Sequence, residues 1–89
     1  MNFEFKKSFA KDLKKKAKGF ELRSRIQDTI QGIGNAKNIS EIKNLKKLKA
    51  EENYYRIRLG DYWIGLIIED GTVIFVRFLH RKEIYRYFP

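Results

Sequence analysis

Residues 54–85 show the clearest alternation of apolar and polar side chains in this sequence. Runs of β-branched and aromatic residues are interrupted twice, once by Gly60-Asp61 and once by Asp70-Gly71. A glycine beside an aspartate supplies the positive-φ positions that two-residue hairpin turns require. The pattern therefore predicts a three-stranded antiparallel meander, with strands over residues 54–59, 62–69 and 72–79.

The two turns also fix the pairing of these strands, and paired residues share a face of the sheet. Arg58 is expected opposite Trp63, and Ile64 opposite Arg77. The predicted helix-packing face is apolar apart from Arg77, and its other members are Tyr55, Ile57, Leu59, Tyr62, Ile64, Leu66, Ile68, Val73, Phe75 and Leu79. The opposite face mixes arginine with aromatic and aliphatic residues, namely Tyr54, Arg56, Arg58, Trp63, Gly65, Ile67, Ile74, Val76 and Phe78. A β-bulge in any strand would change this assignment from that point on.

The first twenty residues predict a strand followed by a helix. Residues 1–7 alternate Phe3 and Phe5 with polar side chains, which is typical of a short strand with one apolar face. Ser8 is a candidate N-cap for the helix, and Gly19 is a candidate C-cap. The apolar positions that follow at helical spacing are Phe9, Leu13, Ala17 and Phe20.

A second helix is predicted from about Glu21 until Gly32 and Gly34 end it. Its apolar stripe consists of Leu22, Ile26, Ile30 and Ile33. In the first helix, Asp12 is expected to pair with Lys16 one turn later. Two helices joined by a short break that contains glycine are typical of an αα-hairpin, and the apolar sheet face would cover their stripes.

The remaining segments are less regular. Ser40 is a candidate cap for a short helical turn that carries Ile42 and Leu45. A basic run follows, made of Lys43, Lys46, Lys47 and Lys49, and it fits either a solvated connection or an RNA-binding loop. Residues 80–88 predict a final helical turn or a short tail.

The order of predicted elements is strand, helix, helix and three strands, followed by the short tail. This order predicts an α+β fold in which one sheet packs on the αα-hairpin. The first strand must reach the sheet through a long helical crossover, so it can lie parallel to one neighbour and make the sheet mixed. With 89 residues, the chain is long enough for one small domain, residues 1–89, and too short for two.

The composition of the chain limits which functions are possible. The chain has no cysteine, which excludes disulfides and thiolate metal sites and suits a cytoplasmic protein, and its single histidine argues against a histidine-based metal site. We see no signal peptide and no membrane-spanning run. The formal net charge of +9 predicts a polyanionic partner, such as nucleic acid or an acidic protein, although a solubilising surface would also account for it.

One cluster of residues has the chemistry to act on a nucleic acid. Its members are Arg56, Arg58 and Trp63 on one predicted sheet face, and His80, Arg81 and Tyr85 after the last strand. Arginine binds phosphate oxygens, aromatic rings stack on unpaired bases, and His80 and Tyr85 can move a proton. Each residue also has a structural explanation. Arg58 and Trp63 can form a cation–π pair that only stabilises the sheet, His80 can end a strand, and Tyr85 can cover the core.

The segment from Tyr54 to Phe88 resembles the C-terminal half of the RelE/ParE superfamily of bacterial toxins. The matching pieces are the sequences YRIRLGDY, VIFVR and HRKEIY, and the preceding strand and helices fit the same architecture. The resemblance implies a type II toxin that a cognate acidic antitoxin holds inactive. It implies either a RelE-like enzyme that cleaves mRNA in the ribosomal A site, without a metal or cofactor, or a ParE-like inhibitor of DNA gyrase.

The resemblance also implies site residues. In RelE-like nucleases, two basic residues on the second strand of the chain, an arginine on the third strand, and an arginine and a tyrosine near the C-terminus line the active site. Arg56 and Arg58 match the first two residues, and Arg81 and Tyr85 match the last two. In such enzymes the ribose 2′-OH attacks the adjacent phosphate. Arginines bind the phosphate, and Tyr85 or His80 would move protons.

The sequence departs from the family pattern at Trp63. The family pattern is Gly-Asp-Tyr-Arg, and this chain has Gly-Asp-Tyr-Trp. An indole has no charge with which to stabilise a phosphate, although it can stack on a base, so a weakened nuclease is expected. The alternatives are a ParE-like gyrase inhibitor and a non-catalytic RNA-binding module. Lys46, Lys47, Lys49 and Trp63 are the expected RNA contacts.

Overall fold

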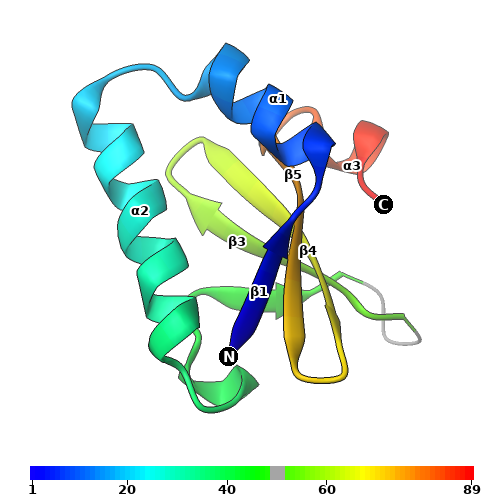
Figure 1. Ribbon diagram of the computed structural model, residues 1–89. Helices are drawn as coiled ribbons and strands as arrows, with labels where there is room; N and C mark the ends of the chain where they lie inside the picture. The colour runs from blue at the N-terminus through cyan, green and yellow to red at the C-terminus, as the bar shows by residue number, and fades with distance from the viewer. Residues whose placement is uncertain (49–51) are drawn as a thin grey trace.

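The computed structural model describes residues 1–48 and 52–89 and contains one five-stranded sheet in the order β1-β5-β4-β3-β2 (Figure 1). The strands are β1 (Asn2–Phe5), β2 (Leu45–Lys47), β3 (Tyr54–Leu59), β4 (Tyr62–Glu69) and β5 (Thr72–His80). The helices are α1 (Lys7–Lys16), α2 (Phe20–Asn35) and α3 (Ile84–Tyr87), with a 3₁₀ turn η1 (Ile39–Glu41). β1 is parallel to β5 and the other pairs are antiparallel, so the predicted mixed sheet is confirmed.

Both predicted hairpins are present. Gly60, Asp70 and Gly71 have positive φ, as two-residue turns of this kind require. The predicted register of the first hairpin is also confirmed, because Arg58 lies opposite Trp63. The local turn chemistry was therefore sufficient to define this half of the sheet.

The second hairpin contains a β-bulge that changes the predicted register. Leu66 pairs with Phe75 and Gly65 pairs with Arg77, so Val76 has no partner on β4. Beyond the bulge every residue of β5 changes face. Ile64 therefore lies opposite Phe78 instead of Arg77, and the predicted faces of residues 77–79 are wrong.

The main core lies between the sheet and the two long helices. α1 and α2 are inclined to one another and lie on the same side of the sheet, and their predicted apolar stripes face it (Figure 1). Phe78 joins this core because of the bulge. Phe20 is the exception among the predicted stripe residues, since it begins α2 and is 88% exposed.

The side chains of α1 complete the hydrogen bonding at the outer edge of β5. β1 ends opposite Phe75, so within residues 1–48 and 52–89 no strand lies beside the edge of β5 beyond that point. Ser8 Oγ donates to the carbonyl oxygen of Val76 at 2.5 Å, and Asp12 Oδ2 accepts from the backbone N–H of Phe78 at 3.0 Å. The predictions that Ser8 is a helix cap and that Asp12 pairs with Lys16 are therefore wrong, because both side chains bind β5 instead.

Asp12 also binds Arg77, with Nε to Oδ2 at 2.7 Å and Nη2 to Oδ1 at 3.2 Å. Asp12 is buried, whereas Arg77 is partly exposed. The hydrogen bonds to the Asp12 carboxylate raise the pKa of Arg77 above its ordinary value. Lys16 instead pairs with Glu83, Nζ to Oε1 at 3.3 Å, which ties the last turn of α1 to the segment before α3.

A second, smaller core covers the opposite face of the sheet. α3 and the residue after it bring Ile84 and Phe88 onto Leu79, and Trp63 packs against this group. Phe88 lies directly over Gly65, where an added Cβ would come within 2.7 Å of the ring. The glycine therefore allows the C-terminal segment to lie close to the sheet.

Several predicted boundaries are corrected. Gly19 precedes α2 rather than ending α1, with φ at +88°, and α2 continues through both of its glycines to Asn35. The turn at η1 is capped by Asn38, whose side chain accepts from Ser40 N, and Leu45 begins a strand rather than joining that turn. The predicted final helical turn is confirmed as α3. Among the described residues, no helix is both long and apolar enough to cross a membrane.

Candidate nucleic-acid site

Three of the predicted site residues meet on the sheet face that α3 partly covers. They come from β3, β4 and α3 and are Arg56, Trp63 and Tyr85. The guanidinium carbon of Arg56 lies 4.3 Å from the centre of the Trp63 ring. The Tyr85 ring meets the same indole edge-on, with ring centres 5.5 Å apart. The side chain that stacks on Trp63 is therefore Arg56, which reaches it diagonally, and not Arg58, which lies directly opposite.

Two further arginines lie at the turn between β3 and β4. Arg58 is exposed, and its Nε donates to the carbonyl oxygen of Gly60 at 3.2 Å. The backbone N–H of Arg81 donates to the carbonyl oxygen of Asp61 at 2.7 Å, and its side-chain Nε lies 3.8 Å from the Asp61 carboxylate. The turn thus brings Arg58 and Arg81 to one end of the sheet, where both guanidinium groups face solvent.

His80 lies apart from this group because of the β-bulge. It pairs with Tyr62, whose side chain lies on the helix-packing face, and its ring meets the Tyr62 ring edge-on at 5.5 Å. His80 Nδ1 accepts a hydrogen bond from the backbone N–H of Lys82 at 3.2 Å. The ring therefore stabilises the turn after β5. This position favours the structural explanation of His80 over a role in proton transfer.

The predicted RNA-contact lysines divide between the two faces. Lys46 pairs with Arg56 and shares its face, where both line a shallow hollow of about 360 Å³ with Arg58. Lys47 points to the opposite face, with its Nζ 5.8 Å from the centre of the Tyr55 ring. Lys49 lies outside the described residues. Lys46 and Lys47 lie next to each other on β2, which is only three residues long and was not predicted from the sequence pattern.

The indole of Trp63 is held mainly by its ring contacts. Its Nε1 is buried and has no hydrogen-bond partner in the described part of the chain. Tyr85 is 73% exposed, so its hydroxyl is open to a ligand. The face therefore presents aromatic surface for a base, guanidinium groups for phosphate oxygens, and one phenol for proton transfer.

Arg77 is a basic residue that sequence reasoning placed on the wrong face. The bulge aligns it with Gly65, in the row across the sheet that also contains Arg56 and Lys46. Its guanidinium carbon lies 5.8 Å from the centre of the Tyr87 ring. Arg77 is the last residue of the VIFVR motif, but the face of the sheet on which it lies follows only from the register shift in β5.

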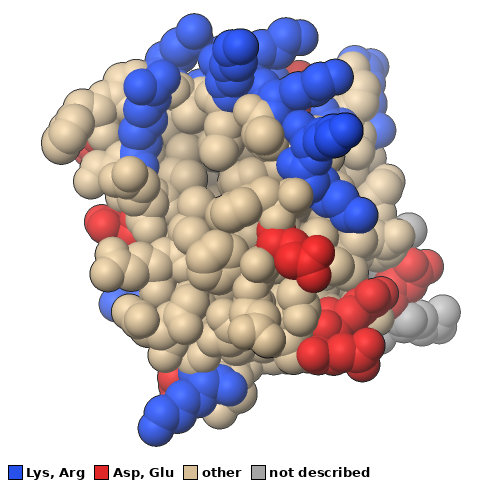
Figure 2. Space-filling model, in the orientation of Figure 1, with Lys and Arg blue, Asp and Glu red and all other residues tan. Residues whose placement is uncertain are grey.

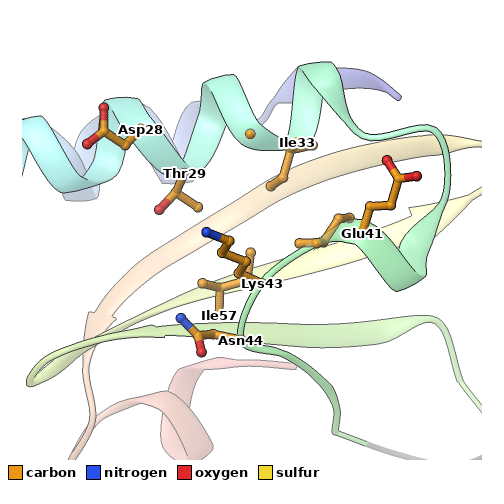
Figure 3. Close-up of a pocket in the computed structure, with 9 residues that line it drawn as sticks. Asp28, Thr29, Ile33, Glu41, Lys43, Asn44 and Ile57 are labelled. Carbon is orange, nitrogen blue, oxygen red and sulfur yellow. The ribbon is translucent and has the colours of Figure 1, made fainter.

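A separate pocket of about 280 Å³ lies between α2 and the segment before β2 (Figure 3). Thr29 extends toward it from α2, Asp28 lies at its rim, and Lys43 and Asn44 line the other side over a floor that includes Ile57. Asn44 also borders the hollow that contains Lys46 and Arg58, so the two depressions adjoin.

Comparison with known proteins agrees with the fold. Residues 3–85 match the family model described as ParE toxin of type II toxin–antitoxin system, parDE. The chain is 46% identical over 90 residues to Toxin RelE3 of Methanocaldococcus jannaschii, and the match covers all of both chains.

Solved structures of toxins from this group are also similar to the chain. The chain resembles the RelB-RelE antitoxin–toxin complex from Methanococcus jannaschii, with 45% identity, 96% of this chain and 98% of that chain covered, and a TM-score of 0.77. The RelBE2 complex from Mycobacterium tuberculosis shares the fold at 22% identity, with 90% of each chain covered and a TM-score of 0.67. YafQ from E. coli also shares it at 16% identity, with 94% of this chain and 97% of that chain covered and a TM-score of 0.64. The chain therefore belongs to the family of ParE toxins of type II toxin–antitoxin systems.

Proposed function

We propose that this toxin is an endoribonuclease that cleaves mRNA on the ribosome. The observation that carries the proposal is the grouping of Arg56, Trp63 and Tyr85 on the sheet face that α3 partly covers, with Arg58 and Arg81 at its end. Such a face can hold a phosphodiester, stack a splayed base and supply a proton. The 46% identity to Toxin RelE3 supports the RelE-like activity over the other activities of the family.

In the proposed reaction, the ribose 2′-oxygen attacks the adjacent phosphorus and the bond from phosphorus to the 5′-oxygen breaks. Arg56 and Arg58 bind the phosphate, because guanidinium groups are too basic to accept a proton at neutral pH. Arg81 stabilises the negative charge that develops on the phosphorane. Tyr85 donates its proton to the leaving 5′-oxygen, and the proton lost by the 2′-hydroxyl restores the phenol through solvent. The products are a 2′,3′-cyclic phosphate and a 5′-hydroxyl.

The test is to incubate the protein with translating ribosomes and map the mRNA ends. The variant Arg81→Ala with Tyr85→Phe should lose cleavage. The matched control is Arg86→Ala with Tyr87→Phe, which makes the same chemical changes at two exposed positions of α3. Cleavage that survives the first pair, or falls equally with both, contradicts the assigned roles.

We also propose an acidic antitoxin as the partner. A net charge of +9 favours association with a polypeptide of opposite charge, and the similar toxin from Methanococcus jannaschii was solved in complex with RelB. The partner would fold along the toxin and cover the arginines of the sheet face. Co-purification of the chain with the acidic product of a neighbouring reading frame tests this proposal.

Inhibition of DNA gyrase is the second candidate function. Two observations favour it: the matching family model is that of ParE toxins, and Trp63 takes the place of a charged phosphate contact. A gyrase supercoiling assay distinguishes the two functions. Inhibition of supercoiling without mRNA cleavage would replace the first proposal with the second.

A further inference from the structure

Most of the net positive charge of this toxin lies on and beside α1, away from the sheet face that carries Arg56 and Trp63. Residues 6–18 hold seven lysines and one aspartate, a net +6 of the chain's +9. That aspartate, Asp12, is buried and bound to Arg77 and to the backbone of Phe78. No carboxylate in this segment is therefore free to neutralise the lysines on its surface.

Four of these lysines form an exposed stripe that we term the α1 lysine cluster: Lys7, Lys11, Lys14 and Lys15. Their spacing places them on one side of the helix over about two turns, each of about 5.4 Å. Lys11, Lys14 and Lys15 line a hollow of about 570 Å³ together with Arg77. In Figure 2, which shares the view of Figure 1, Lys and Arg gather at the end of the molecule where α1 lies.

The cluster adjoins the segment that carries the candidate catalytic residues. Arg77 borders the hollow and also contacts the ring of Tyr87 on α3. Lys16, at the end of the same helix, is paired with Glu83 just before α3. One large polyanion could therefore contact the cluster and the sheet face at the same time.

The chemistry of the cluster fits a phosphate backbone better than a protein surface. Lysine is depleted at protein interfaces, whose centres favour aromatic residues, methionine and arginine, whereas the residues of this stripe are all lysine. Lysine is a flexible point charge that contacts phosphates without reading bases. Double-helical RNA is recognised mainly through its shape and its phosphates.

We propose that the α1 lysine cluster is a second RNA-contact surface, which binds the phosphates of double-helical RNA. In the setting of the proposed function, that RNA would be structural RNA of the ribosome, and the cluster would anchor the toxin while the sheet face acts on mRNA. The inference rests on the proposed function only for the identity of that RNA. Binding of an RNA duplex can be measured whether or not the chain cleaves mRNA.

The test compares two variants of equal charge for binding to a blunt RNA duplex of mixed sequence over a range of salt concentrations. The first is Lys11→Gln, Lys14→Gln and Lys15→Gln, which removes the lysines of the hollow. The control is Arg23→Gln, Arg25→Gln and Lys37→Gln, three exposed cations that lie on α2 and in the segment after it. Each variant lowers the net charge by three, so a difference between them reports position rather than total charge. Circular dichroism checks that both are folded.

Loss of three phosphate contacts should lower the slope of log Kd against log salt by about 2 to 3. Between about 50 and 200 mM salt, the factor by which Kd rises should then be about 40 times smaller for the first variant than for the unmodified chain. The control should show the same rise in Kd as the unmodified chain. Equal slopes for the two variants, or failure of the unmodified chain to bind the duplex, overturn the proposal. A first variant that binds RNA normally but loses affinity for the antitoxin would assign the cluster to that protein instead. Failure of the proposed function appears separately, as absence of mRNA cleavage by the unmodified chain.

Discussion

Replacing Trp63 with arginine tests how the sheet face works. If the face is a nuclease site that lacks one phosphate ligand, Trp63→Arg should increase the rate of mRNA cleavage. Position 63 lies opposite Arg58 and beneath Arg56, so the new guanidinium would extend into the same surface. One preorganised donor to a developing negative charge is worth about 2.7–4 kcal/mol in other enzymes, or roughly 10²–10³ in rate.

The same substitution should reduce stability. It removes the contact between Arg56 and the indole, worth about 0.5–1 kcal/mol when exposed, and the edge-on contact with Tyr85, worth about 0.5–1.5 kcal/mol. It also places a third cation beside Arg56 and Arg58. We expect a loss of about 1–3 kcal/mol, which lowers the melting temperature by about 4–8 °C for each kcal/mol in a chain of this size.

The control is Trp63→Gln, which removes the ring without adding a charge. Both variants should melt at lower temperatures, but only Trp63→Arg should cleave mRNA faster on translating ribosomes and arrest the growth of cells that lack the antitoxin. The reasoning is refuted if the folded arginine variant is no faster than the glutamine variant. It is also refuted if the unmodified chain is already as fast as Trp63→Arg.

Three further outcomes follow from the contacts in the structure. Asp12→Ala should cost about 3 kcal/mol of unfolding free energy, measured with urea, because it leaves Arg77 and the backbone N–H of Phe78 without their partner; an unchanged midpoint would contradict this. Gly65→Ala should displace the Phe88 ring and cost about 1–3 kcal/mol, whereas a stability equal to that of the unmodified chain would mean that the C-terminal segment is not packed there. Association with an acidic antitoxin, followed by stopped flow, should slow as salt rises, and a salt-independent rate would exclude electrostatic attraction.

The parts of the fold that were predictable are those determined by neighbours in sequence. The glycine–aspartate turns established the meander and placed Arg58 opposite Trp63. Helical spacing identified the buried positions of α2. Short elements such as β2 have too few residues to produce a recognisable period, so alternation could not reveal that strand.

The parts that were not predictable depend on contacts between distant residues. Ser8 and Asp12 look like local helix features, yet their partners in β5 lie 68 and 66 residues away. The bulge at Val76 occurs where β1 ends and α1 takes over the edge of β5, a meeting of elements that the sequence of β5 alone does not encode. Because that bulge shifts the register, it moves Phe78 into the core and His80 away from the predicted site.

The candidate site was predictable where it depends on residues close together in the sequence. The first hairpin, which precedes the bulge, placed Arg56, Arg58 and Trp63 on one face. Arg81 and Tyr85 were candidates because of their chemistry and their position after the last strand, and the resemblance to known toxins then matched them to site residues of the family. Which arginine stacks on Trp63 depends on how far a long side chain reaches diagonally across two strands, and pairing rules do not determine this.

The most direct test of the central claim is the chemistry of the mRNA ends produced on translating ribosomes, measured for the unmodified chain and for Trp63→Arg. Attack by the 2′-hydroxyl predicts a 2′,3′-cyclic phosphate on the upstream fragment and a 5′-hydroxyl on the downstream fragment. Ends with a 3′-hydroxyl and a 5′-phosphate would mean that water attacks the phosphate by another mechanism. Intact mRNA with both proteins would contradict the assignment of this toxin as a ribosome-dependent endoribonuclease.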